Sequence, residues 1–219
     1  MRLDISGRGI KSLKEYFSTY DGNINDITEL DCRNNHLTTL QGCPESVTKL
    51  WCSINKLTTL EECPKSVTIL DCSYNKITSL KGCPERVTFF DCSCNQLTSL
   101  QGCPESVITL DCHCNQLTTL QGCPKNVTEL YCWDNRLTTL QGCPENITEF
   151  YYSGNPLLKI YRGENIIKIQ EINLKIDNFI KNVKKNKIIK NFNDVKNIWL
   201  QDFYKPDGIY VQLTDIFFN

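Results

Sequence analysis

Apolar residues recur every 20 positions over most of the chain, from about residue 27 to about residue 157. One unit, residues 47–57, reads Val-Thr-Lys-Leu-Trp-Cys-Ser-Ile-Asn-Lys-Leu. The alternation of inward Leu50 and Cys52 with outward Trp51 and Ser53 predicts a short strand that buries one face. Self-similarity at such a period indicates a stack of like structural units. The most regular apolar position is occupied by Leu30, Leu50, Leu70, Phe90, Leu110, Leu130 and Phe150.

Between the strands, the sequence favours tight bends and extended backbone. An asparagine recurs with the same period, and its side-chain amide at a bend can bond backbone groups of the neighbouring coil. About nine residues separate Leu40 from the next strand, and Pro44 fixes φ within them. That segment is too short for a helix, so we expect extended or polyproline-like backbone opposite the strands. The asparagines are Asn35, Asn55, Asn75, Asn95, Asn115, Asn135 and Asn155.

The unit resembles the leucine-rich repeat, whose pattern LxxLxLxxNxL is matched by residues 47–57 with Cys52 in the third apolar slot. The 20-residue length resembles the short repeats of bacterial effector proteins, and the cysteine-rich variant resembles leucine-rich repeat proteins of giant DNA viruses that infect amoebae. The resemblance covers roughly residues 3–160. It implies an α/β repeat solenoid, a right-handed coil with a parallel sheet on its concave side, and the concave face as the usual binding surface.

Both ends of the repeat region are predicted to be caps. In residues 1–29, an N-terminal capping repeat has Ile5 in the cysteine slot and Arg8 in the asparagine slot, and a seven-residue insertion follows. Residues 30–160 form the solenoid of 20-residue units. In residues 161–219 the apolar spacing becomes helical, which predicts a mainly helical C-terminal cap over the open end of the core. Its lysine-rich face could instead touch a partner or a membrane surface.

Composition and charge narrow the function classes. The formal net charge is −1, so no strong overall field attracts nucleic acid or membrane. The N-terminus lacks the apolar stretch of a secretory signal, and no run of about 18 apolar residues predicts a membrane span. An acidic concave face also disfavours nucleic-acid binding. We therefore expect an intracellular protein, cytoplasmic by default, that needs no cofactor; its oligomeric state is open.

Twelve of the 14 cysteines fall into two columns with the repeat period. Stacked strands about 4.8 Å apart hold same-face Cβ atoms too far apart for unstrained disulfides along a column. The spacing also matches no zinc-finger pattern. We interpret these cysteines as small buried hydrophobes. The columns are Cys32, Cys52, Cys72, Cys92, Cys112 and Cys132, and Cys43, Cys63, Cys83, Cys103, Cys123 and Cys143.

Cys94 and Cys114 lie outside both columns, each two residues beyond an inward cysteine and on successive coils. With His113 beside them, they are candidates for a soft-metal site or for a redox-sensitive thiol pair whose pKa nearby carboxylates raise. The alternative is two surface thiols produced by repeat copying. A hydrolase site made of Cys114, His113 and Asp111 is disfavoured because consecutive strand residues alternate faces, so we expect a protein that is not an enzyme.

The outward strand residues predict the binding surface. Asp71, Asp91 and Asp111 stand on successive strands, where they repel one another, and a basic partner or a bound cation would relieve that repulsion. Aromatic residues, which are typical interface anchors, flank this acidic strip; the alternative is duplication of Asp by repeat copying. We predict a protein–protein interaction scaffold whose concave face binds a basic or mixed-charge protein, with a metal or redox module at Cys94, Cys114 and His113 as the alternative. The predicted partner-binding residues are Trp51, Asp71, Tyr74, Phe89, Asp91, Asp111, His113, Tyr131, Trp133 and Tyr151.

Overall fold

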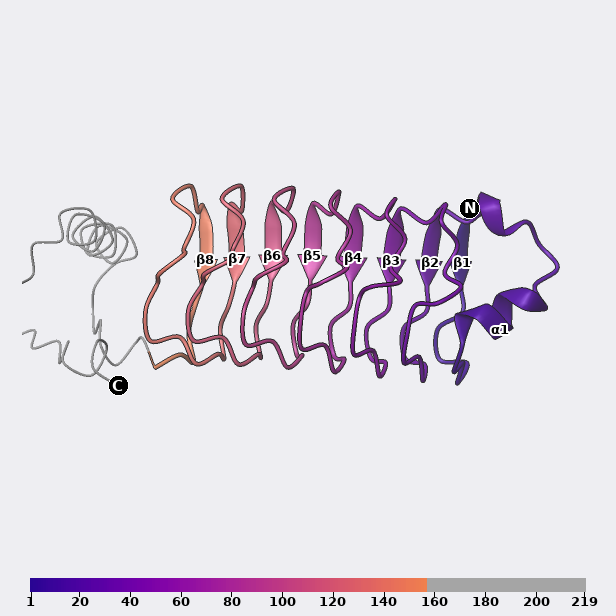
Figure 1. Cartoon of the computed structure of the whole chain (residues 1–219), viewed down its shortest axis with the longest axis horizontal. Helices are drawn as coiled ribbons and strands as arrows, with labels where there is room; N and C mark the ends of the chain where they lie inside the picture. The colour runs from indigo at the N-terminus through magenta and orange to yellow at the C-terminus, as the bar shows by residue number, and fades with distance from the viewer. Residues whose placement is uncertain (157–219) are drawn as a thin grey trace, which may run out of the picture. The chain divides into compact units, whose positions relative to one another are not determined.

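The computed structural model of the chain describes residues 1–156, so the predicted helical cap at 161–219 lies outside the described residues. Within residues 1–156, eight parallel strands form one sheet in sequence order (Figure 1). Each strand is three residues long, and the next lies beside it in the order of the chain. The strands are β1 (Arg2–Asp4), β2 (Glu29–Asp31), β3 (Lys49–Trp51), β4 (Ile69–Asp71), β5 (Phe89–Asp91), β6 (Thr109–Asp111), β7 (Glu129–Tyr131) and β8 (Glu149–Tyr151).

The register of the sheet follows the repeat period. Leu50 lies opposite Leu70 between β3 and β4, and the same 20-residue offset holds from β2 to β8. Between β1 and β2, Leu3 lies opposite Leu30, an offset of 27 that reflects the inserted residues. The predicted parallel solenoid with strands at the apolar repeat position is therefore confirmed.

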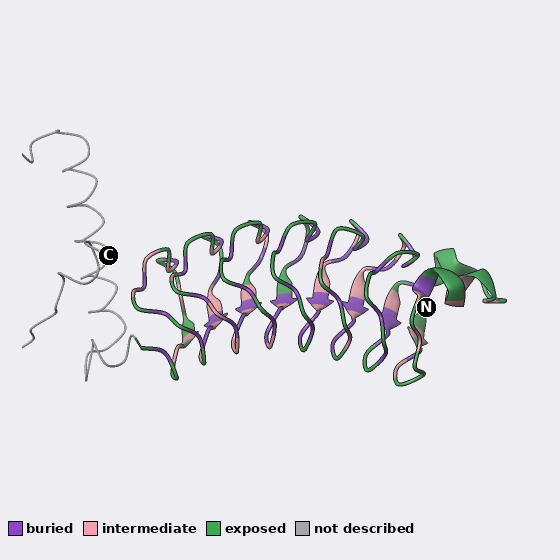
Figure 2. Ribbon diagram, turned by 60° about the horizontal axis from the view of Figure 1, so that its bottom comes forward, coloured by how far each residue is buried: buried purple, intermediate pink, exposed green. Residues whose placement is uncertain are grey.

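The core is a continuous column of apolar side chains behind the sheet. The central residue of each strand from β2 to β7 is fully buried, whereas β1 and β8 at the two ends of the sheet are more exposed (Figure 2). Val47, Leu50, Cys52, Leu57 and Leu60 of one coil are all 0% exposed. Each of these positions repeats 20 residues later, so successive coils pack like on like.

The asparagine of each coil bonds its own coil and the one before it, as the sequence predicts. The Asn95 side chain donates to the carbonyl of Cys92 in its own coil and to that of Cys72 in the preceding coil. Its Oδ1 accepts from the backbone N–H of Ile77 at 2.9 Å. Because Asn95 is buried, these bonds satisfy backbone groups that water does not reach.

The chain between β1 and β2, which is seven residues longer than in the other coils, forms two short helices that the sequence pattern does not predict. Helix α1 spans Leu13–Ser18 beside β1, and the 3-10 helix η1 spans Ile24–Asp26 (Figure 1). The signal for α1 is local: the Ser12 side chain accepts a hydrogen bond from the Glu15 backbone N–H, which is half of a capping box. From residue 27 to residue 156 the backbone between strands forms turns and bends rather than helices. No helix in the described part of the chain combines the length and apolar character needed to cross a membrane.

Candidate functional site

On each strand, the residues before and after the inward central residue project outward. They form two outward rows across the sheet, one that contains Phe89 and one that contains Asp91. Asp71 lies opposite Asp91, and Asp91 lies opposite Asp111, so the predicted acidic strip occupies three adjacent strands. Trp51 precedes the strip on β3, and Tyr131 and Tyr151 follow it on β7 and β8. The structure therefore brings the predicted acids together in one row with three of the predicted aromatic residues.

The aspartates of this row have a structural role that the sequence argument did not include. Each accepts a hydrogen bond from the backbone N–H two residues later, which holds the bend at the end of the strand. Asp71 also accepts from the hydroxyl groups of Ser53 and Ser73, at 2.9 and 2.7 Å. The backbone bonds are Ser73 N to Asp71 (3.0 Å), Ser93 N to Asp91 (2.9 Å) and His113 N to Asp111 (3.1 Å).

Burial, more than repulsion, controls the charge of the central aspartate. Loss of water raises the pKa of Asp91 to about 6 from an ordinary value of 3.8. Its hydrogen bonds with Ser93 oppose this rise, and the neighbouring Asp111 and Asp71 carboxylates add smaller upward contributions. The repulsion expected from the sequence is present, but it is not the largest cause of the shift.

The N-terminal end of the row is neutralised within the protein. The buried Asp31 carboxylate accepts from Arg33 Nε at 2.9 Å and from Arg33 Nη2 at 2.6 Å. Arg2 lies 3.6 Å from the same carboxylate and also packs over the Trp51 ring at 5.4 Å. Sequence reasoning missed both arginines, although Arg33 stands two residues after Asp31 and therefore on the same face of the strand.

Four of the predicted residues form two stacked pairs toward the C-terminal end of the repeats. The Tyr131 and Tyr151 rings are parallel with centroids 5.0 Å apart. The His113 and Trp133 rings stack at 3.9 Å with an interplanar angle of 10°. Of the three other predicted aromatic residues, Trp51 lies beneath Arg2, and Tyr74 and Phe89 are 59% and 43% exposed. The predicted aromatic residues thus lie on the strands or just beyond their ends and do not form one cluster.

One backbone position at the end of every strand has a left-handed conformation. Tyr74 has φ of 52° and Ile54 has φ of 55°, in a region that side chains other than Gly, Asn and Asp rarely adopt. The 20-residue periodicity does not reveal this conformation. The residues that occupy it are Gly7, Asn34, Ile54, Tyr74, Cys94, Cys114, Asp134 and Gly154.

Cys94, His113 and Cys114 come together at the ends of β5 and β6. His113 Nδ1 lies 2.6 Å from Asp111 Oδ1, and His113 Nε2 lies 3.7 Å from Cys94 Sγ. The two thiol sulfurs and a ring nitrogen of His113 all lie within 4.8 Å of one another. Loss of water and the neighbouring Cys94 raise the pKa of the Cys114 thiol to about 11, with smaller contributions from Asp134 and Asp111.

The column cysteines are not among the three clustered residues, although the Cys92 thiol donates to the Asp111 carbonyl at 3.4 Å. The prediction that both columns are buried is wrong for Cys103, Cys123 and Cys143, which are partly exposed. Cys32, Cys52, Cys72, Cys92, Cys112 and Cys132 are buried reduced thiols, as the column pattern predicts. Burial raises the pKa of Cys52 and Cys72 well above the ordinary thiol value, so both stay protonated. They act as small core side chains.

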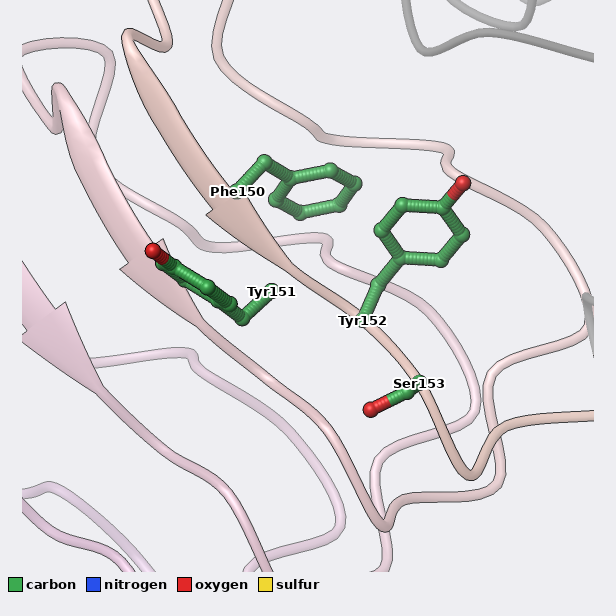
Figure 3. A pocket seen from close by; sticks show the side chains of 4 residues that line it. All are labelled: Phe150, Tyr151, Tyr152 and Ser153. Carbon is green, nitrogen blue, oxygen red and sulfur yellow. The ribbon is translucent and has the colours of Figure 1, made fainter.

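A cavity of about 280 Å³ lies at the last described strand, away from the Cys94 cluster. Figure 3 shows the Phe150 and Tyr152 rings on one side of β8 and the Tyr151 ring on the other. Phe150 and Tyr152 occupy the core slots that Leu130 and Cys132 fill in the preceding coil, and their rings stack at 4.8 Å. The cavity is lined by these two core-slot residues and also by Tyr151 and Ser153, so it lies at the end of the core and borders the outward face.

Comparison with solved structures gives the same architecture. YopM from Yersinia enterocolitica matches with a TM-score of 0.60 and 29% identity over 70% of this chain and 33% of that one. YopM from Yersinia pestis, a leucine-rich effector protein, matches with a TM-score of 0.53 and 30% identity over 59% and 37%. The functional domain of InlJ from Listeria monocytogenes, which includes a cysteine ladder, matches with 0.57 and 28% over 70% and 35%.

This chain is a leucine-rich repeat solenoid, similar in fold to these bacterial proteins. It spans about a third of the length of each of the three. No protein-family model and no curated protein sequence matches the chain. The resemblance to giant-virus proteins stays a prediction.

Proposed function

We propose that this protein is a non-enzymatic scaffold that binds a protein partner of basic or mixed charge on the outward face of its sheet. The observation that carries the proposal is the exposure of large aromatic side chains on that face and at the bend that follows its strands. Tyr74, Phe89 and Tyr151 are 59%, 43% and 51% exposed. Aromatic side chains that remain in water on one side of a sheet are the kind of residue that anchors protein interfaces.

The charge of the face supports a basic partner. Ion pairs involve the outward acids at the N-terminal end, Asp31 and Glu29. From β4 to β8, the outward strand positions in the described structure include Asp71, Asp91, Asp111, Glu129 and Glu149 but no lysine or arginine. A partner with lysine or arginine side chains would supply the missing positive charge.

The test is affinity capture from the native lysate with a Tyr74→Asn/Phe89→Thr variant beside the parent. These changes remove aromatic anchors and leave the hydrogen-bonded aspartates intact, and asparagine suits the left-handed backbone at residue 74. We expect a protein retained by the parent to bind the variant at least about tenfold more weakly, because anchor residues dominate interface energies. Raising the salt concentration should weaken the same complex.

The matched control is Ile24→Thr/Ile108→Thr, which removes exposed apolar surface outside the outward rows. This control should retain the partner. Equal capture by the parent and the Tyr74→Asn/Phe89→Thr variant would place the interaction elsewhere and overturn the proposal. Capture of an acidic partner would contradict the proposed basic or mixed charge of the partner but not the proposed binding face.

A second candidate function rests on a separate observation. The convergence of Cys94, His113 and Cys114 favours a metal or redox site over two thiols left by repeat copying.

A further inference from the structure

We propose that Cys94, His113 and Cys114 bind one zinc ion at the ends of strands β5 and β6. The zinc site needs no protein partner, so the test of this proposal is independent of the test of the protein interaction proposed above. Each of the three residues offers one ligand atom, and these atoms lie within 4.8 Å of one another.

The distances suit a tetrahedral ion. With Zn–S bonds of about 2.3 Å and Zn–N bonds of about 2.0 Å, ligand atoms around zinc lie roughly 3.5 to 3.8 Å apart. Cys94 Sγ and His113 Nε2 are already 3.7 Å apart. The other distances between ligand atoms are at most 4.8 Å. Side-chain rotations that move these atoms by about 1 Å bring them to the distances that zinc requires.

The imidazole is already oriented as a ligand. Asp111 Oδ1 lies 2.6 Å from His113 Nδ1, so this nitrogen carries the proton and donates it to the carboxylate. In the neutral imidazole Nε2 is then the nitrogen with the free lone pair, and it lies 3.7 Å from Cys94 Sγ. A carboxylate that orients the second ring nitrogen is a regular feature of histidine–metal sites. Stacking on Trp133 at 3.9 Å further fixes the plane of the ring.

The backbone places the two thiols in equivalent positions on adjacent coils. Cys94 and Cys114 have φ of 51° and 50°, and parallel-ladder hydrogen bonds hold both bends. Both side chains are partly exposed, whereas the nearby column residues Cys92 and Cys112 are 0% exposed. An ion from solvent therefore reaches Cys94 and Cys114 without opening the core.

The donor set selects the metal. Two thiolates and an imidazole favour Zn²⁺ over Mg²⁺ or Ca²⁺, which prefer oxygen ligands. On binding, each thiol gives its proton to water and its sulfur bonds the ion; no electron is transferred. Three protein ligands leave the fourth tetrahedral position of zinc for water.

The test is titration of the reduced, purified full chain with Zn²⁺ alone and with Co²⁺ alone, in separate experiments. We expect one ion per chain, a thiolate-to-cobalt charge-transfer absorption, and partial quenching of tryptophan fluorescence by cobalt bound to His113, whose ring stacks on Trp133. The Cys94→Ser/Cys114→Ser variant should lose the absorption. Asp111→Asn should keep the stoichiometry and bind zinc about 10- to 100-fold more weakly, because the carboxylate only orients the ligand.

The matched control is Cys103→Ala/Cys123→Ala, which removes two partly exposed cysteines from adjacent coils on the other column. It should bind cobalt as the parent does. The proposal is overturned if the reduced parent shows no charge-transfer band, or if the Cys94→Ser/Cys114→Ser variant, folded by circular dichroism, binds as well as the parent. Displacement of the ion by millimolar Mg²⁺ would also overturn it, because it would indicate an oxygen site.

Discussion

Ile54 and Tyr74 occupy a backbone position where four other coils have asparagine, aspartate or glycine and two have cysteine. Their φ values of 55° and 52° crowd Cβ against the backbone, and the crowding is worst for a β-branched residue such as isoleucine. Both side chains are also more than half exposed, so burial does not offset the strain. Backbone strain and an apolar side chain left in water both destabilise the fold at this position. The two side chains are therefore better explained by a role in surface interactions than by a contribution to stability.

Replacing the strained isoleucine should therefore stabilise the protein. We expect Ile54→Asn to raise the free energy of unfolding by about 1 kcal/mol, because asparagine tolerates the left-handed region. Ile108→Asn is the matched control: Ile108 is 48% exposed, close to the 52% of Ile54, but is not at a positive-φ position. Urea unfolding of both variants measures the difference, and equal effects at the two positions would show that Ile54 is not strained.

The protonation of a single aspartate should affect stability. The pKa of Asp91 is raised by burial to about 6 in the folded protein, and the ordinary value of 3.8 applies when the chain unfolds. The folded state therefore holds the proton more tightly between these values, and the free energy of unfolding falls as the pH rises through them. The destabilising contribution is fully present above about pH 6 and is relieved as the pH falls toward 4.

Asp91→Asn removes this titration and keeps an acceptor for the Ser93 N–H. We expect the variant to be more stable than the parent at pH 7, by on the order of 2 kcal/mol, and the difference to shrink toward pH 4. Urea unfolding of the two proteins at several pH values measures the difference. A gap that stays constant from pH 7 to pH 4 would mean that Asp91 does not titrate as described.

At the scale of the element, the unit of this fold is a coil and its asparagine rather than a strand. A strand of three residues makes too few hydrogen bonds to define a sheet alone. The buried asparagine adds bonds to its own coil and to the preceding one, and it does so in every repeat from Asn35 to Asn155. Coil-to-coil coupling therefore depends on this side chain as much as on the strand ladder.

Loss of one such asparagine should be costly. In Asn95→Ala, the Ile77 N–H loses its buried partner, and the Cys72 carbonyl keeps only the hydrogen bond from the Asn75 side chain. Because an unsatisfied buried polar group costs about 1–3 kcal/mol, we expect a loss of about 3 kcal/mol in the free energy of unfolding. The exposed neighbour Gln96 provides the control, since Gln96→Ala should change stability by less than about 0.5 kcal/mol. Similar urea midpoints for the two variants would contradict the bridging role.

At the scale of the whole molecule, the repeat determined what the sequence could predict. The strand register, the core and the asparagine bonds follow from positions that recur unchanged, such as Leu50 and Asn55. Helix α1 interrupts the repeat, so periodicity does not show it and only the local Ser12–Glu15 signal does. Periodicity therefore predicts the structure of the positions that all coils share, and it does not predict the segments that depart from the repeat.

The candidate metal site was predictable only in part, because its geometry depends on departures from the repeat. Cys94 and Cys114 were recognisable as the cysteines outside the columns. The position of the His113 ring between Asp111 and Cys94 depends on the left-handed bend after each strand and on stacking with Trp133, which a single sequence does not display. The burial that raises the pKa of Asp91 is likewise a property of the packed coils.

The equivalence of the coils has a consequence for how such a gene can change. Because Asn75 bonds the coil of Cys52 just as Asn95 bonds the coil of Cys72, recombination that adds or deletes one whole 20-residue unit joins surfaces that already match. A change in length that is not a whole unit has to be accommodated between strands, as the extra residues between β1 and β2 are, because a shift inside a strand would turn its inward side chains to the wrong face. Recombination of whole units avoids this constraint. The adjacent pair Cys94 and Cys114 survives when its two units are inherited together.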